Sequence, residues 1–175
     1  MKLTVLAAAV LVAGCASTGT TAPTVGQPTT TKPTISTPAG IVLPDRARTP
    51  GATNPAVTQA TIHTTICVAG WTATVRPPAN YTGHLKLAQL QTGYTHAGDT
   101  DPRDYEEDHL IPLELGGAPS SPLNLWPEPY AGTGAHVKDR VENRLHTLVC
   151  AGRVSLAVAR HAIAADWWVA YRTYS

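Results

Sequence analysis

The segment Glu106-Glu107-Asp108-His109 contains the residue types in this sequence that are best suited to chemistry. An unperturbed imidazole titrates near neutral pH, so His109 could act as a general base. A hard divalent cation prefers oxygen ligands, and the neighbouring Asp108 offers a carboxylate. Adjacent residues of a strand point to opposite faces, so both side chains could serve one site only if the backbone bends there. The alternative is a structural Asp108–His109 hydrogen bond within a packed hairpin.

A longer pattern surrounds this pair. After Asp108-His109 come an apolar residue, Pro112, a Gly116-Gly117 turn and then Asn124-Leu125, ahead of a segment with helical periodicity. This order resembles the HNH, or His-Me finger, endonucleases over about residues 104–148. The order of helices and strands, given below, indicates an α+β fold. The resemblance implies that this fold has a small ββα-metal hairpin-helix core with additional flanking helices. It also implies phosphodiester hydrolysis, with His109 as the base and Asn124 holding the hairpin loop and orienting His109.

The metal ligands depart from the family pattern. Many members carry a His or Asn three positions before a Lys, but Ala135 precedes Lys138 at that spacing and His136 is one step out of register. We expect Asp108 and His136 to bind the metal, with Glu128 or Asp139 as alternatives to His136. An exposed His136 at a helix end is an equally simple interpretation. Mg²⁺ is the expected cation, with Mn²⁺, Ni²⁺ or Zn²⁺ as alternatives.

Several secondary structure elements must position these residues. Residues 57–67 are ambiguous between helix and strand, and we favour a helix; residues 82–92 form a second. Two short strands, one within 105–115 and one at 123–126, form an irregular hairpin. A helix follows from about residue 135 to Gly152, with an apolar stripe at Val137, Val141, Leu145 and Leu148. Ser155 caps a last helix whose stripe runs to Trp167.

The N-terminus has the features of a lipoprotein signal. Residues 1–14 contain Lys2, a ten-residue apolar run and small residues before Cys15, in a pattern that resembles the bacterial lipobox. A lipidated Cys15 would hold the protein on the outer face of the cell membrane; the alternative is an ordinary secretory signal. Residues 16–40 contain 9 Thr, 2 Ser, 4 Pro and 3 Gly, so 15–53 is predicted to be a disordered linker ahead of a domain at 54–175.

The remaining two cysteines are predicted to form a disulfide. Cys67 and Cys150 are an even pair in an oxidising compartment, and no Cys-x-x-Cys motif is present. A catalytic or zinc-binding thiolate is the less favoured alternative.

The charge of the chain limits its mode of nucleic-acid binding. The net charge is +1, which excludes a protein that coats nucleic acid by charge alone. We expect Lys138, Arg140 and Arg144 to contact a nucleic acid substrate, DNA in preference to RNA, although a solvated helix face is an alternative. Two functions follow: a lipid-anchored, metal-dependent nuclease, or a catalytically silent HNH-like envelope lipoprotein that acts as a binding module. No protein partner is predicted for the nuclease.

Overall fold

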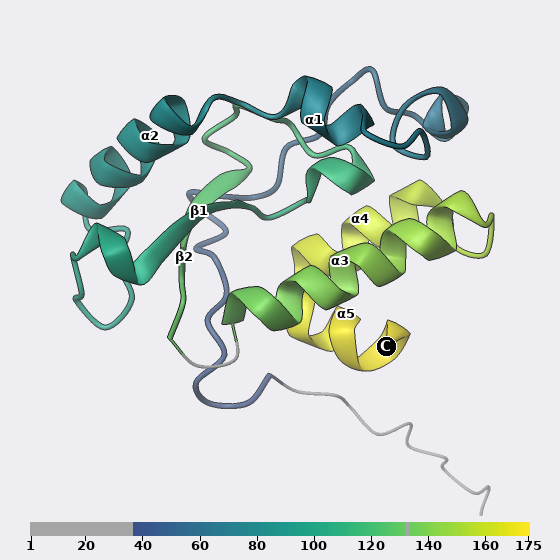
Figure 1. The fold of residues 1–175 in the computed structure, drawn as a ribbon. Helices are drawn as coiled ribbons and strands as arrows, with labels where there is room; N and C mark the ends of the chain where they lie inside the picture. Colours follow the sequence, from purple (N-terminus) through teal and green to yellow (C-terminus); the bar gives the residue numbers. More distant parts are fainter. Residues whose placement is uncertain (1–36, 132–133) are drawn as a thin grey trace, which may run out of the picture. The chain divides into compact units, whose positions relative to one another are not determined.

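The computed structural model describes residues 37–131 and 134–175, which form a small α+β fold (Figure 1). An antiparallel two-stranded hairpin packs against several helices, as the sequence predicts. The described elements, in chain order, are η1 (Ile62–Thr64), α1 (Trp71–Val75), α2 (Ala79–Gln91), η2 (Pro102–Asp104), β1 (Tyr105–His109), η3 (Leu113–Leu115), β2 (Leu125–Pro129), α3 (Gly134–Cys150), α4 (Leu156–Ala165) and α5 (Trp167–Tyr174).

The hairpin has a regular register. Tyr105 pairs with Pro129 and His109 pairs with Leu125, and the residues between them pair one to one without a bulge. Because side chains alternate along a strand, residues 106 and 108 lie on one face of β1 and residues 105, 107 and 109 on the other. The hairpin therefore separates the side chain of Asp108 from that of His109.

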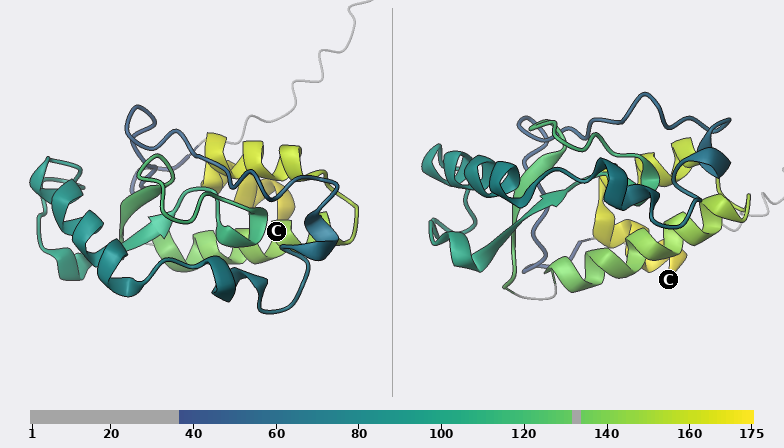
Figure 2. Two further views of the ribbon diagram at one scale, coloured as in Figure 1. Left: turned by 90° about the horizontal axis from the view of Figure 1, so that it is seen from above. Right: turned by 45° about the horizontal axis from the view of Figure 1, so that its top comes forward.

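The main hydrophobic core lies between α3, α4 and α5, which contact one another. Figure 2 shows α3, in green, next to the yellow C-terminal helices. The predicted stripe of α3 is confirmed, because all four of its residues are buried. Leu156, Ala159 and Ile163 of α4 pack against this stripe. At about 25 cal/mol per Å² of apolar surface, such burial is the main stabilisation of the domain.

The last helix predicted from the sequence is two helices. α4 ends at Ala165, and Asp166 adopts extended dihedral angles that interrupt the helix. Its carboxylate accepts a hydrogen bond from the backbone N–H of Val169, which makes Asp166 the N-cap of α5. The apolar stripe continues through Trp167, which is fully buried, so periodicity alone could not reveal the break.

The helix predicted over residues 57–67 is wrong. Within this range, regular structure is limited to the short 3₁₀ turn η1, and the rest consists of turns. The hydroxyl of Thr61 donates to the carbonyl of Ala56, and that of Thr65 donates to the carbonyl of Thr61. These local hydrogen bonds compete with a helix and explain why a Thr-rich segment forms turns.

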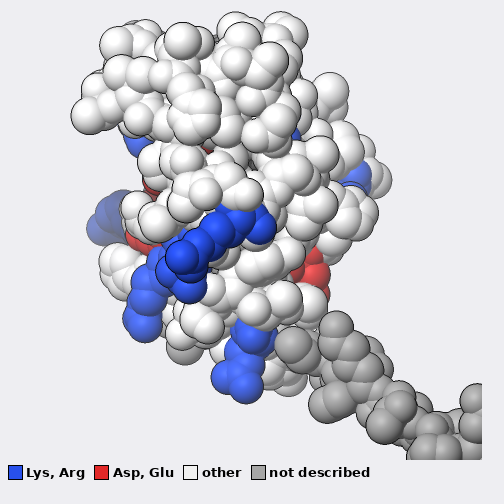
Figure 3. Space-filling view, turned by 90° about the vertical axis from the view of Figure 1, so that its right-hand side faces the viewer, with Lys and Arg blue, Asp and Glu red and all other residues white. Residues whose placement is uncertain are grey.

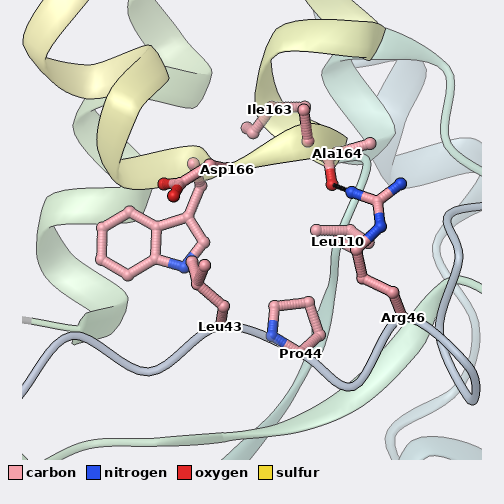
Figure 4. Close-up of a pocket in the computed structure, with 9 residues that line it drawn as sticks. Leu43, Pro44, Arg46, Leu110, Ile163, Ala164 and Asp166 are labelled. Atoms are coloured by element: carbon pink, nitrogen blue, oxygen red, sulfur yellow. Dashed lines mark hydrogen bonds between the residues drawn. The ribbon is translucent and has the colours of Figure 1, made fainter. Parts of the chain in front are cut away.

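Residues 41–53, which we assigned to the linker, pack on the domain instead. The carbonyl of Val42 accepts a hydrogen bond from the indole of Trp167, and Thr49 is fully buried. Figure 4 shows Leu43 and Pro44 beside a pocket that is also lined by Ile163 of α4. The guanidinium of Arg46 donates to the carbonyl of Ala164. The apolar Ile41-Val42-Leu43 run was the signal for this attachment, so the linker ends earlier than predicted.

The predicted disulfide between Cys67 and Cys150 is present, with the two Cα atoms 5.7 Å apart. It joins the turns that precede α1 to the C-terminal end of α3. Among the described residues, no helix is both long enough and apolar enough to cross a bilayer.

Candidate functional site

Three carboxylates share one face of the hairpin. Glu106 and Glu128 are directly opposite each other in the register, and Asp108 follows two residues after Glu106 on the same face. One oxygen atom from each of these three side chains lies within 4.8 Å of the others. The cross-strand register and the two-residue period of β1 thus place three acidic side chains together.

The ammonium group of Lys138 lies against this cluster. The Lys138 side chain projects from α3 and is only 1% exposed. It donates hydrogen bonds to the carboxylates of Asp108 and Glu142 and to the backbone carbonyl of His109, the last at 2.9 Å. The carboxylate of Glu128 is 3.9 Å from Nζ, which is too long for a hydrogen bond. Lys138 therefore ties the N-terminal part of α3 to the end of β1.

The acidic groups respond differently to this environment. Burial raises the pKa of Glu142 to about 8 despite the attraction of Lys138, and it raises the pKa of Glu128 well above the usual value. Burial also opposes ionisation of Asp108, but the adjacent ammonium and hydrogen bonds outweigh it, so the pKa of Asp108 is lowered. Asp108 is thus the carboxylate most strongly held in its charged form.

His109 lies on the opposite face of β1 and is 5% exposed. Its Nε2 atom is 2.8 Å from the backbone carbonyl of Pro119, which can only accept a hydrogen bond. Nε2 therefore carries the hydrogen in the neutral ring, and the lone pair is on Nδ1. Burial lowers the pKa of His109, and Lys138 and then Arg76 add smaller effects in the same direction, so the neutral ring predominates at pH 7.

Asn124 fastens the loop that connects the two strands. It is fully buried, and its side-chain oxygen accepts a hydrogen bond from the backbone N–H of Ile111. Its amide group donates to the carbonyl oxygens of Ile111 and Ala118. Gly117 is required beside it, because a Cβ there would lie 2.7 Å from Nδ2 of Asn124. Asn124 thereby fixes the loop that carries Pro119, the hydrogen-bond partner of His109.

The site differs from the sequence prediction in its ligand set. Asp108 lies in the acidic cluster, whereas His136 is exposed on α3. The effect of His136 on the cluster is a small lowering of the pKa of Glu106. Glu106 and Glu142 were missed, although Glu106 is two residues from Asp108 on a strand and Glu142 is four residues from Lys138 on a helix. Both spacings place side chains on a shared face.

The three residues that we expected to contact nucleic acid differ in their exposure to solvent. Arg140 and Arg144 are exposed on α3 and four residues apart, so they share a helix face. Lys138 is buried and paired with carboxylates, so the expectation that it contacts nucleic acid is wrong. Figure 3 shows a face of the molecule on which basic side chains gather. Cys15, the predicted lipidation site, lies outside the described residues.

A polar cleft of about 200 Å³ lies beside Glu142, one of the carboxylates that Lys138 contacts. Glu114, Glu142 and Arg76 are among the residues that line it, and they come from η3, α3 and the end of α1. Arg76 is exposed and also influences the pKa of His109. The cleft therefore contains an exposed guanidinium whose charge acts on His109, although His109 itself does not line the cleft.

No family model, curated protein or solved structure matches this chain.

Proposed function

We propose that this protein is a metal-dependent nuclease of the HNH type that hydrolyses phosphodiester bonds with His109 as the general base. The observation that carries the proposal is the clamp formed by Asn124. It holds the hairpin loop through three hydrogen bonds and thereby places the carbonyl of Pro119 against the imidazole of His109. The hairpin followed by α3 supplies the strand–strand–helix order of a ββα finger.

The residues around His109 support the role of base. The hydrogen bond to Pro119 orients the ring and leaves its other nitrogen free to accept a proton from water. Because the pKa of His109 is lowered, the ring remains in the accepting form below neutral pH. Arg76, exposed near His109, could contact a substrate phosphate.

A divalent cation at Asp108 would neutralise charge on the phosphodiester when bound. The donors fit a hard cation such as Mg²⁺, because Asp108 is charged and lies among other carboxylates. The regular register of β1 places Asp108 and His109 on opposite faces. In this proposal the end of β1 bends when substrate binds, so that the cation at Asp108 and the imidazole of His109 act on the same phosphodiester.

The test is cleavage of plasmid DNA and of RNA by the purified protein, with Mg²⁺ or Mn²⁺ and after chelation. His109→Ala is expected to lose at least about 100-fold in rate, because general-base catalysis contributes about 10²–10⁴-fold. His161→Ala, at an exposed position on α4, is the matched control and should retain full activity. Metal-independent cleavage, absence of cleavage by the wild type, or an active His109→Ala variant would contradict the proposal.

A second function is favoured by Lys138. Its ammonium pairs with Asp108 and Glu142, so the fold satisfies these carboxylates without a metal ion. This arrangement suits a catalytically silent HNH-like module that binds a partner in the cell envelope. Under this alternative, the cleavage assay gives no product with any metal, while the protein remains folded.

We also propose that the protein is anchored by lipid on Cys15 to the outer face of the cell membrane. Incorporation of labelled fatty acid should be lost in Cys15→Ala, and the variant should leave the membrane fraction. Unchanged membrane retention of Cys15→Ala would contradict the anchor.

A further inference from the structure

We infer that Glu106, Asp108 and Glu128 together bind one hard divalent cation on the hairpin face opposite His109. The inference rests on the proposed function for what the cation does, but the binding site itself is argued from the geometry of the three carboxylates. In this ligand set, Glu106 and Glu128 take the place of His136 as the partners of Asp108.

The spacing of the three side chains suits a single ion. Ca²⁺–oxygen distances are about 2.3–2.6 Å and Mg²⁺–oxygen distances about 2.0–2.1 Å, so two oxygens on one ion are at most about 5 Å apart. The candidate oxygens of Glu106, Asp108 and Glu128 all lie within 4.8 Å of one another. Their backbone positions are fixed by the strand register. Small side-chain rotations therefore suffice to close them around a cation.

Glu128 provides the independent evidence for a ligand. Its side chain is 1% exposed, and among the described residues no N–H or hydroxyl group donates a hydrogen bond to either of its carboxylate oxygens. The neighbouring carboxyl of Asp108 can pair with Glu128 only if a proton lies between them. A buried carboxylate in this state is costly unless it binds a proton or a cation. It faces Glu106 across the hairpin and lies beside Asp108, so its oxygens are directed into the cluster.

Lys138 does not fill this role. An ammonium group has three N–H donors, and those of Lys138 are used by Asp108, Glu142 and the carbonyl of His109. No donor remains for Glu128. The cluster thus contains four carboxyl groups, those of Glu106, Asp108, Glu128 and Glu142, against one ammonium. A divalent cation would supply the partner that the ammonium of Lys138 does not offer to Glu106 and Glu128.

Glu106 gives the site access to solvent. Its side chain is half-buried, while Glu128 forms the closed floor of the cluster. Trp126 is the cross-strand partner of Asp108 and therefore lies on the same hairpin face. Its indole can serve as a spectroscopic reporter for an ion bound there.

The experiment titrates the purified full-length protein with Tb³⁺, excited through tryptophan, and with Mn²⁺, followed by electron paramagnetic resonance. We expect saturable binding of one ion per protein, with Tb³⁺ emission displaced by excess Ca²⁺. Glu128→Gln preserves the shape of the side chain and is expected to weaken Mn²⁺ binding by about tenfold or more, as befits loss of a ligand. Glu107→Gln makes the same substitution on the opposite face of β1, at a carboxyl that is likewise buried without a hydrogen-bond partner among the described residues, and should leave the affinity unchanged.

The outcomes separate this inference from the proposed nuclease function. One bound Mn²⁺ that Glu128→Gln weakens supports the site, even if no nucleic acid is cleaved. Absence of binding, or equal loss in both variants, overturns the site even if the protein cuts DNA. In that case Glu128 would carry a proton, which infrared spectroscopy would reveal as a protonated-carboxyl C=O band that disappears in Glu128→Gln.

Discussion

Replacement of Lys138 by Met tests the ion-pair network between α3 and the hairpin. Met has a similar length but no charge, so it removes the cation from Asp108 and Glu142 and leaves the packing volume nearly unchanged. Removal of one partner from a buried ion pair costs about 3–5 kcal/mol, because the other charge is left buried. The side chains of Asp108 and Glu142 are 24% and 13% exposed, so water compensates in part. We therefore expect a loss of about 3 kcal/mol in the free energy of unfolding at pH 7.

The loss should depend on pH in a defined direction. In the wild type, Lys138 lowers the pKa of Asp108 in the folded protein, and the ionised Asp108 therefore stabilises the fold. This stabilisation is fully present above the pKa of Asp108 in the unfolded chain, near 4, and it is lost as pH falls through the lower pKa of the folded protein. In Lys138→Met, the largest effect that opposes burial at Asp108 is lost, so we expect the pKa of Asp108 to rise above the unfolded value. The variant then takes up a proton more readily when folded, so its deficit should shrink between pH 7 and pH 5.

Urea unfolding at pH 7 and pH 5 measures both effects. Arg140→Met is the matched control, because it removes one positive charge from an exposed position on the same helix. It should change stability by no more than about 0.5 kcal/mol. A deficit below about 1 kcal/mol for Lys138→Met at pH 7, or one that is equally large at pH 5, would refute the network.

Two further predictions concern the covalent and steric constraints of the fold. The Cys67→Ala/Cys150→Ala variant should lose up to about 4–5 kcal/mol in urea unfolding, because the disulfide spans 83 residues of the unfolded chain; a loss below about 1 kcal/mol would contradict this. Gly117→Ala should lose about 1–3 kcal/mol, because the new Cβ meets the Ile111 carbonyl and the Asn124 amide. Gly83→Ala, in α2 with nothing within 4 Å of the added Cβ, should instead gain about 0.5–1 kcal/mol; equal effects of the two glycine substitutions would count against the Asn124 clamp.

Local patterns in the sequence were enough to predict several elements of this fold. The 3.6-residue period of α3 and the glycine turn between two short extended runs depend on neighbouring residues. The structure contains both, with Gly116 in the left-handed conformation at the end of η3. The Cys67–Cys150 pair was predicted because only two cysteines remain after Cys15. The apolar periodicity gave wrong helix boundaries where side chains form hydrogen bonds with the backbone. This occurs at Asp166, which caps α5, and in the Thr-rich turns before α1.

The candidate site was decided by tertiary structure. The sequence drew attention to Asp108, His109 and Asn124, because their types and order resemble a known motif. It could not show that a straight β1 separates Asp108 from His109, since that depends on the register with β2. Nor could it show that Lys138 is buried against Asp108 rather than exposed to a phosphate, since the packing of α3 on the hairpin sets the surroundings of that ammonium. Residue type sets what chemistry is available, whereas the dielectric environment and the neighbouring charges that control it come from residues distant in sequence.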